Sequence, residues 1–77
     1  MKPLIFTVSA SWDAEARVWS GVCDAIPAAA DAATLDDLLS AISAMALDLL
    51  PDNYPGVDPG SVFVQLNALR EVDPLAA

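Results

Sequence analysis

The chain has 77 residues, with a single cysteine, no histidine, 11 acidic and 3 basic side chains, and a formal net charge of −8. This length suits one small domain (residues 1–77), and one cysteine without histidine supplies neither an internal disulfide nor a Cys/His zinc cage. The negative charge opposes binding to nucleic-acid phosphates and to anionic membrane surfaces, so neither is an expected partner.

Apolar residues are abundant for so small a chain, at 56% of the sequence with a mean hydropathy of +0.49. A domain of this size has few interior positions, so we expect part of this apolar surface to be buried against another copy in a homo-oligomer. The apolar runs are shorter than the roughly 20 residues that cross a bilayer, and the N-terminus does not resemble a signal peptide. A cytoplasmic location is therefore expected.

A hairpin of two strands is predicted at the start of the chain. Residues 3–12 place an apolar side chain at every second position, namely Leu4, Phe6, Val8, Ala10 and Trp12. This period of two is typical of a half-buried strand. Residues 13–16 are a polar turn, and residues 17–22 return as the second strand. Pro27 then fixes a bend, and residues 28–32 are predicted as a short third strand.

The most distinct pattern in the chain is an amphipathic helix that begins after Thr34. The Thr34 hydroxyl suits the N-cap, and Asp36 and Asp37 suit the first turn, where carboxylates meet the positive end of the helix dipole. Apolar side chains then follow the helical repeat at Leu35, Leu38, Leu39, Ile42, Met45, Ala46 and Leu49. We predict that Pro51 ends the helix.

The remainder of the chain is predicted as a loop, a last strand and a tail. Residues 51–60 contain several prolines and glycines, residues 61–69 alternate as a strand, and residues 71–77 form the tail. The order β-β-β-α-β predicts an α+β fold in which a right-handed crossover places the last strand parallel to the first. One helix then covers one face of a four-stranded sheet, and the open face is either solvated or an interface, with candidates Ile5, Trp19, Phe63 and Leu69.

The element order and four short motifs resemble the HicB-like antitoxins. The motifs are the acidic tip Asp13-Ala14-Glu15, the pair Val18-Trp19, the bend Asp24-Ala25-Ile26-Pro27, and the helix start Thr34-Leu35-Asp36-Asp37-Leu38-Leu39. The resemblance covers residues 4–50 and is closest to a compact, single-domain branch of HicB-like proteins of undefined function. Where the family usually has glycine after the proline of the bend, this chain has Ala28.

The resemblance implies an incomplete ribonuclease-H-like fold and an antitoxin function. HicB-like proteins neutralise HicA, a small basic toxin that cleaves mRNA, and full-length members carry a C-terminal DNA-binding segment. No basic segment follows the last predicted strand here, so we expect no direct nucleic-acid binding by this domain.

Catalysis is not expected. Ribonuclease-H-like nucleases hold Mg²⁺ with carboxylates, one of which lies in the middle of the first strand, and residues 6–10 contain no acid. The absence of histidine removes the conventional catalytic triad. Cys23 is interpreted as a packed core residue, and Trp12 and Trp19 as packing residues, so no catalytic residue, cofactor or metal is predicted.

Two functions remain open from the sequence. In the first, the chain is an antitoxin whose acidic surface docks on a basic toxin, with Asp13, Glu15, Asp36 and Asp37 as candidate contacts, although acids at these positions equally suit a turn and a helix start. In the second, the chain is a self-associating structural or small-ligand-binding module. A neighbouring gene for a small basic protein would favour the first function.

Overall fold

The computed structural model describes residues 3–72 and confirms the predicted β-β-β-α-β order and the α+β fold class. The elements are β1 (Leu4–Asp13), β2 (Val18–Cys23), β3 (Ala29–Ala32), α1 (Leu35–Asn53), the short 3-10 helix η1 (Pro59–Ser61) and β4 (Val62–Leu69). Most of the predicted tail, residues 73–77, lies outside the described residues.

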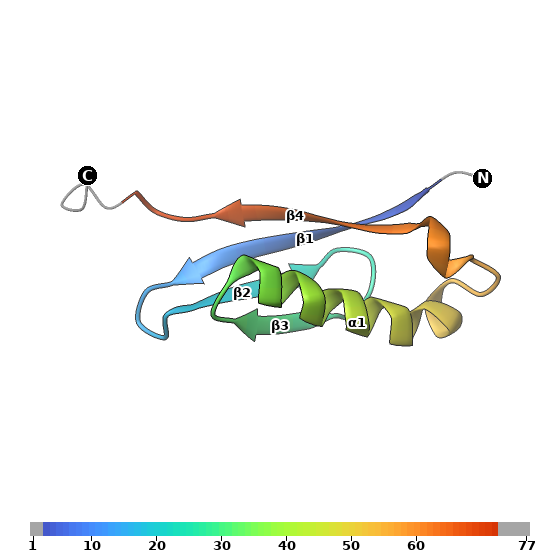
Figure 1. Ribbon diagram of the computed structural model, residues 1–77, viewed down its shortest axis with the longest axis horizontal. Coiled ribbons are helices and arrows are strands. Elements are labelled where there is room, and N and C mark those ends of the chain that lie inside the picture. Colours follow the sequence, from blue (N-terminus) through green and yellow to red (C-terminus); the bar gives the residue numbers. More distant parts are fainter. Residues whose placement is uncertain (1–2, 73–77) are drawn as a thin grey trace.

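The four strands form one mixed sheet in the order β3-β2-β1-β4. β1 pairs antiparallel with β2 and parallel with β4, and β2 pairs antiparallel with β3. Figure 1 shows how α1 carries the chain back along the sheet so that β4 can run beside β1 in the same direction. The predicted parallel pairing of the first and last strands is therefore confirmed.

The β1–β2 turn lies one residue later than predicted. Asp13 still pairs with Val18, so the loop comprises residues 14–17 instead of 13–16. Arg17 has a φ of 57° and its backbone N–H donates to the Asp13 carbonyl at 2.7 Å. Arg17 thus adopts a left-handed backbone conformation at the end of the loop, and this conformation turns the chain back into β2. Arginine rarely adopts it, so the sequence does not indicate it.

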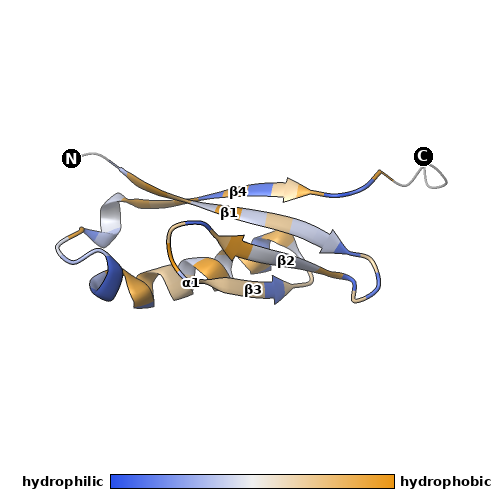
Figure 2. Cartoon of the chain, turned by 180° about the vertical axis from the view of Figure 1, so that it is seen from behind, coloured by the Kyte–Doolittle hydropathy of each residue, from blue (hydrophilic) through white to orange (hydrophobic). Residues whose placement is uncertain are grey.

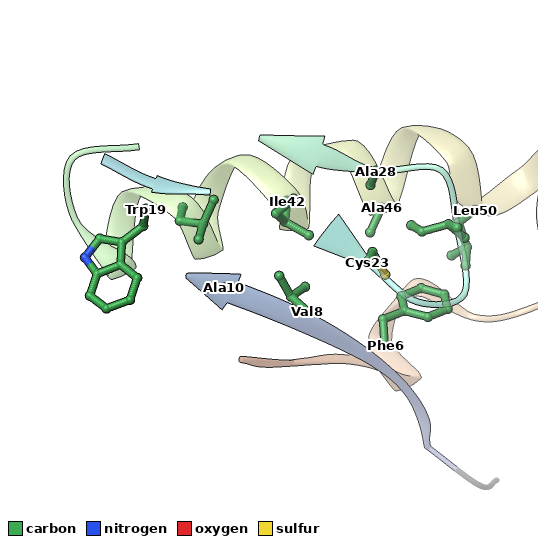
Figure 3. Close-up of a cluster of buried hydrophobic side chains, with 11 residues drawn as sticks. Phe6, Val8, Ala10, Trp19, Cys23, Ala28, Ile42, Ala46 and Leu50 are labelled. Carbon is green, nitrogen blue, oxygen red and sulfur yellow. The ribbon is translucent and has the colours of Figure 1, made fainter. Parts of the chain in front are cut away.

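The hydrophobic core lies between α1 and one face of the sheet. From the helix, Leu38, Ile42, Ala46 and Leu50 are buried in a line with a spacing of four residues. From β1, Phe6, Val8 and Ala10 face them (Figure 3). These buried residues differ from the predicted apolar positions toward the C-terminal end of α1, where Met45 is partly exposed and Leu50 is buried.

Trp19 lies on the covered face of the sheet, so its predicted place on the open face is wrong. It pairs with Trp12 across the hairpin, and directly opposed residues of antiparallel strands project from the same face. Trp12 belongs to the core-facing alternation of β1, so Trp19 points the same way and is buried. The two ring centroids are 5.4 Å apart at an interplanar angle of 59°.

The prediction that Pro51 ends the helix is also wrong, because α1 continues to Asn53. Pro51 lies in the last turn, where its missing N–H removes one hydrogen bond but leaves neighbouring carbonyls accessible to other donors. The Tyr54 N–H donates to the Leu50 carbonyl at 2.7 Å, and the Asn53 side chain donates to the Leu49 carbonyl at 2.8 Å. These bonds complete the final turn.

The close approach of α1 to β2 yields a stability prediction at Gly21. A Cβ at this position would lie 3.0 Å from Leu38 Cδ2 and 3.2 Å from Val8 Cγ1, both on fully buried side chains. We expect Gly21→Ala to lower the free energy of unfolding by about 1–2 kcal/mol through overpacking. Gly60→Ala is the matched control, since its nearest contact is 3.4 Å, and we expect a change within about 0.5 kcal/mol. Equal losses in urea denaturation would contradict this packing.

Candidate protein-binding site

An apolar groove runs between α1 and β4. Its volume is about 270 Å³, and it is lined by Leu39, Ser43, Ala46 and Leu47 of α1 and by Pro59, Val62 and Val64. The groove exists because α1 packs mainly against β3 and β2 and reaches β4 at few positions. In Figures 1 and 2, which view the molecule from opposite sides, α1 overlies β2 and β3 while β4 extends beyond it.

The open face of the sheet carries several large apolar side chains. Ile5, Val22, Phe63 and Leu69 are 53%, 60%, 57% and 75% exposed, respectively. Ile5 pairs with Phe63 across the β1–β4 ladder, so their side chains lie next to each other on this face. The predicted exposure of Ile5, Phe63 and Leu69 is confirmed. Together with the groove, this face leaves apolar surface on both sides of β4.

The four predicted contact acids lie at one end of the molecule. Asp13 and Glu15 belong to the β1–β2 hairpin end, and Asp36 and Asp37 belong to the first turn of α1. Figure 1 places the hairpin loop and the start of α1 at the same end, and all four side chains are exposed. The structure therefore gathers residues that are more than 20 positions apart in the sequence.

Part of this acidic end has a structural role. The Asp13 Oδ1 accepts hydrogen bonds from the backbone N–H groups of Glu15 at 3.1 Å and Ala16 at 3.2 Å, which orders the turn. The Asp37 N–H donates to the Thr34 hydroxyl at 3.1 Å, which confirms the predicted N-cap. Glu15 and Asp36 are exposed without such a role in the fold, so they are better placed than Asp13 to contact a partner.

Asp24 holds the Asp-Ala-Ile-Pro bend onto β1, a role that the sequence pattern did not predict. The Thr7 N–H donates to Asp24 Oδ1 at 3.1 Å, and the Asp24 N–H donates to the Thr7 carbonyl at 3.0 Å. Ile26 of the same bend is buried in the core. Because this contact joins residues 17 positions apart, no local pattern in the sequence indicated it.

The remaining candidates for chemistry are packed into the fold. Cys23 is buried, and its thiol lies 3.9 Å from Asp24 Oδ1, as expected for a core residue. The guanidinium of Arg70 lies 4.7 Å from the centroid of the Trp12 ring, a cation–π contact that joins the end of β4 to the hairpin. The interpretation of both tryptophans as packing residues is confirmed.

Residues 3–72 contain neither a metal-binding cluster nor a membrane-spanning helix. Within this range no group of three or more His, Cys, Asp or Glu side chains is arranged to hold a metal ion. In the same part of the chain, no helix is both long and apolar enough to cross a membrane.

A family of sequences matches nearly the whole chain. The model of a domain of unknown function (DUF1902) matches residues 5–74. The chain belongs to this family. No curated protein matches the sequence.

A solved structure similar to this DUF1902 chain supports the same fold. The crystal structure of a hypothetical protein from the extremely thermophilic bacterium Thermus thermophilus is 36% identical in sequence, with a TM-score of 0.71. The match covers 90% of this chain and 97% of the other. The similarity thus extends across the sheet, the helix and the connection between α1 and β4.

The Asp24 contact with β1 yields a second stability prediction. We expect Asp24→Ala to lower the free energy of unfolding by about 1 kcal/mol, because the Thr7 N–H loses its side-chain acceptor. Asp24→Asn retains an oxygen acceptor and should lose less. Glu15→Ala, an exposed control, should change stability by less than about 0.5 kcal/mol. Thermal denaturation of the three variants checks the order, and a wild-type stability for Asp24→Ala would contradict it.

Proposed function

We propose that this chain is a non-catalytic binding module that neutralises a small basic RNA-cleaving protein, in the manner of HicB-like antitoxins. The observation that carries the proposal is the charge of the surface. Residues 3–72 contain ten acidic side chains, which are the 11 of the whole chain less Asp73, and all ten are exposed. A basic protein is the electrostatic complement of such a surface.

The acids and the groove would serve different parts of the binding process. Exposed ion pairs contribute about 0–1 kcal/mol each, so Glu15 and Asp36 would mainly accelerate and orient the encounter. Affinity requires apolar contacts that leave water on binding. The groove supplies these through Leu39, Leu47 and Val62, none of which is fully buried in the isolated chain.

Neutralisation follows from competition for the same basic surface. A protein that cleaves RNA presents Lys and Arg side chains to the phosphate backbone. An acidic module bound to those side chains excludes the RNA, without any reaction on the antitoxin. The resemblance of the hairpin tip, the bend and the helix start to HicB-like proteins supports this mechanism.

Co-expression tests the proposed function directly. The chain should restore the growth of cells that express a small basic protein encoded beside it, and the two proteins should co-purify in a stoichiometric complex. Purified complex should no longer cleave RNA, whereas the basic protein alone should. A toxic basic neighbour whose growth defect and RNA cleavage are unchanged by this chain would contradict the proposal.

A matched pair of charge-reversal variants locates the contact. Glu15→Lys with Asp36→Lys changes the acidic end, and Asp48→Lys with Asp52→Lys changes the net charge equally near the other end of α1. Because both double variants change the net charge equally, a difference between their association rates reports where on the surface the basic protein binds. We expect the first pair to slow association with the basic protein about tenfold and the second pair to have a smaller effect. Stopped-flow measurements at two salt concentrations check this, and equal slowing would refute a localised acidic contact.

A further inference from the structure

β4 is an edge strand without the features that usually protect an edge. It is the last strand of the sheet order, and its eight residues include no charged residue, proline or glycine. In any edge strand, alternate residues direct their N–H and C=O groups away from the sheet. Nothing within residues 3–72 pairs with this side of β4. Such a strand is a template for a further strand.

The opposite edge of the same sheet is protected. β3 has four residues, and one of them is Asp31, whose side chain is exposed. Short length and a charged residue are the usual means by which a soluble protein prevents edge-to-edge pairing. The contrast between the two edges indicates that β4 is left open for a specific partner.

The packing of β4 is incomplete in this chain. None of its eight residues is buried, although it pairs with β1 along its whole length. The Cα radius of gyration is 14.2 Å, compared with about 11 Å for a compact chain of this length. If β4 is an internal strand of a larger assembly, the exposure of its side chains and the extended shape of the single chain are both explained.

The charge distribution permits a second copy to reach β4, despite the net charge of −8. No ionisable side chain lies within β4, and the neighbouring strand β1 carries none before Asp13 at its far end. The acids that flank β4 in sequence are Asp58 and Glu71, both outside the strand. The centre of the edge is therefore a neutral strip on an otherwise acidic molecule, where two copies can meet without apposing carboxylates.

We infer that two copies of this chain pair their β4 strands antiparallel about Leu66, forming one eight-stranded sheet. This inference is independent of the proposed antitoxin function. On the open face, Phe63 lies opposite Leu69 of the second copy, and Gln65 lies opposite Asn67 of the second copy. On the groove face, Leu66 meets Leu66 of the second copy. Apolar side chains thus pair with apolar ones, and amides with amides.

Neighbouring registers match the strand less well. Residues that lie opposite each other in the two strands must point to the same face of the sheet. The two-fold axis that relates the copies can therefore pass through a residue of β4 but not between two residues. A centre at Gln65 places Phe63 opposite Asn67, and a centre at Asn67 places Phe63 opposite Glu71. Only the register about Leu66 pairs both exposed apolar residues of β4 with each other.

The size of this interface suits a concentration-dependent dimer. A strand of eight residues is about 26 Å long, and one layer of a sheet is about 10 Å thick with its side chains. The contact is therefore roughly 260 Å² per copy and about 500 Å² in total, which places it among the small interfaces of weak, reversible complexes. We therefore expect dissociation in the micromolar range.

Sedimentation equilibrium of the full chain tests the dimer, with one disruptive and one control variant. The wild type should approach twice the 8.0 kDa chain mass at submillimolar concentration. Phe63→Lys should remain monomeric, because it places a charge opposite Leu69 of the second copy. Val22→Lys is matched to it, since Val22 has a similar exposure on the same face but lies on β2. A monomeric wild type, or dimers lost equally in both variants, would overturn the inference.

A cysteine pair tests the register, and does so even if Phe63→Lys impairs folding. Phe63→Cys with Leu69→Cys should cross-link two chains under mild oxidation, because directly opposed residues have Cβ atoms about 4.5–5.5 Å apart. The same two positions within one chain are about 20 Å apart and cannot bridge internally. Each single variant, which retains the buried Cys23, should stay uncross-linked. Cross-linking of the singles, or none in the pair, would overturn the proposed register.

Discussion

The packing of one helix against a four-stranded sheet governs the rest of this structure. α1 buries Leu38, Ile42, Ala46 and Leu50 against the core face of the sheet, and this contact holds the crossover that brings β4 parallel to β1. A helix is about 10 Å wide and the strands are about 4.8 Å apart, so one helix covers roughly two strands fully. The strand furthest from its axis, β4, therefore keeps apolar surface on both faces.

This geometry separates a packed core from the surface that the proposed partners would contact. Around the core, the tryptophan pair, the Asp24 contact with Thr7 and the Thr34 cap fix the hairpin, the bend and the helix start. The surface, by contrast, combines exposed acids with an apolar groove and an open edge. Those features suit the recognition of other proteins, and the two proposed partners would use different regions: a basic protein the acidic end and the groove, and a second copy the edge of β4.

Sequence patterns predicted the elements well, because alternation and the helical repeat report directly which face of each element is buried. The strands, the N-cap and the parallel pairing of β1 with β4 followed from them. Trp19 was misplaced because its face depends on pairing with Trp12, and Pro51 because bonds from Tyr54 and Asn53 complete the last turn. The groove depends on the lateral position of α1 over the sheet, which no local pattern encodes. Likewise, the sequence identified each of the four candidate contact acids, but only the fold shows that they lie at the same end of the molecule.

Amide hydrogen exchange reports whether β4 completes its burial against another molecule. In solutions of this chain alone, we expect alternate amides of β4 to exchange more slowly as the concentration rises from low micromolar to submillimolar, while those of the protected edge β3 do not change. Fast exchange from β4 that is independent of concentration, as for β3, would show that β4 has no second strand beside it.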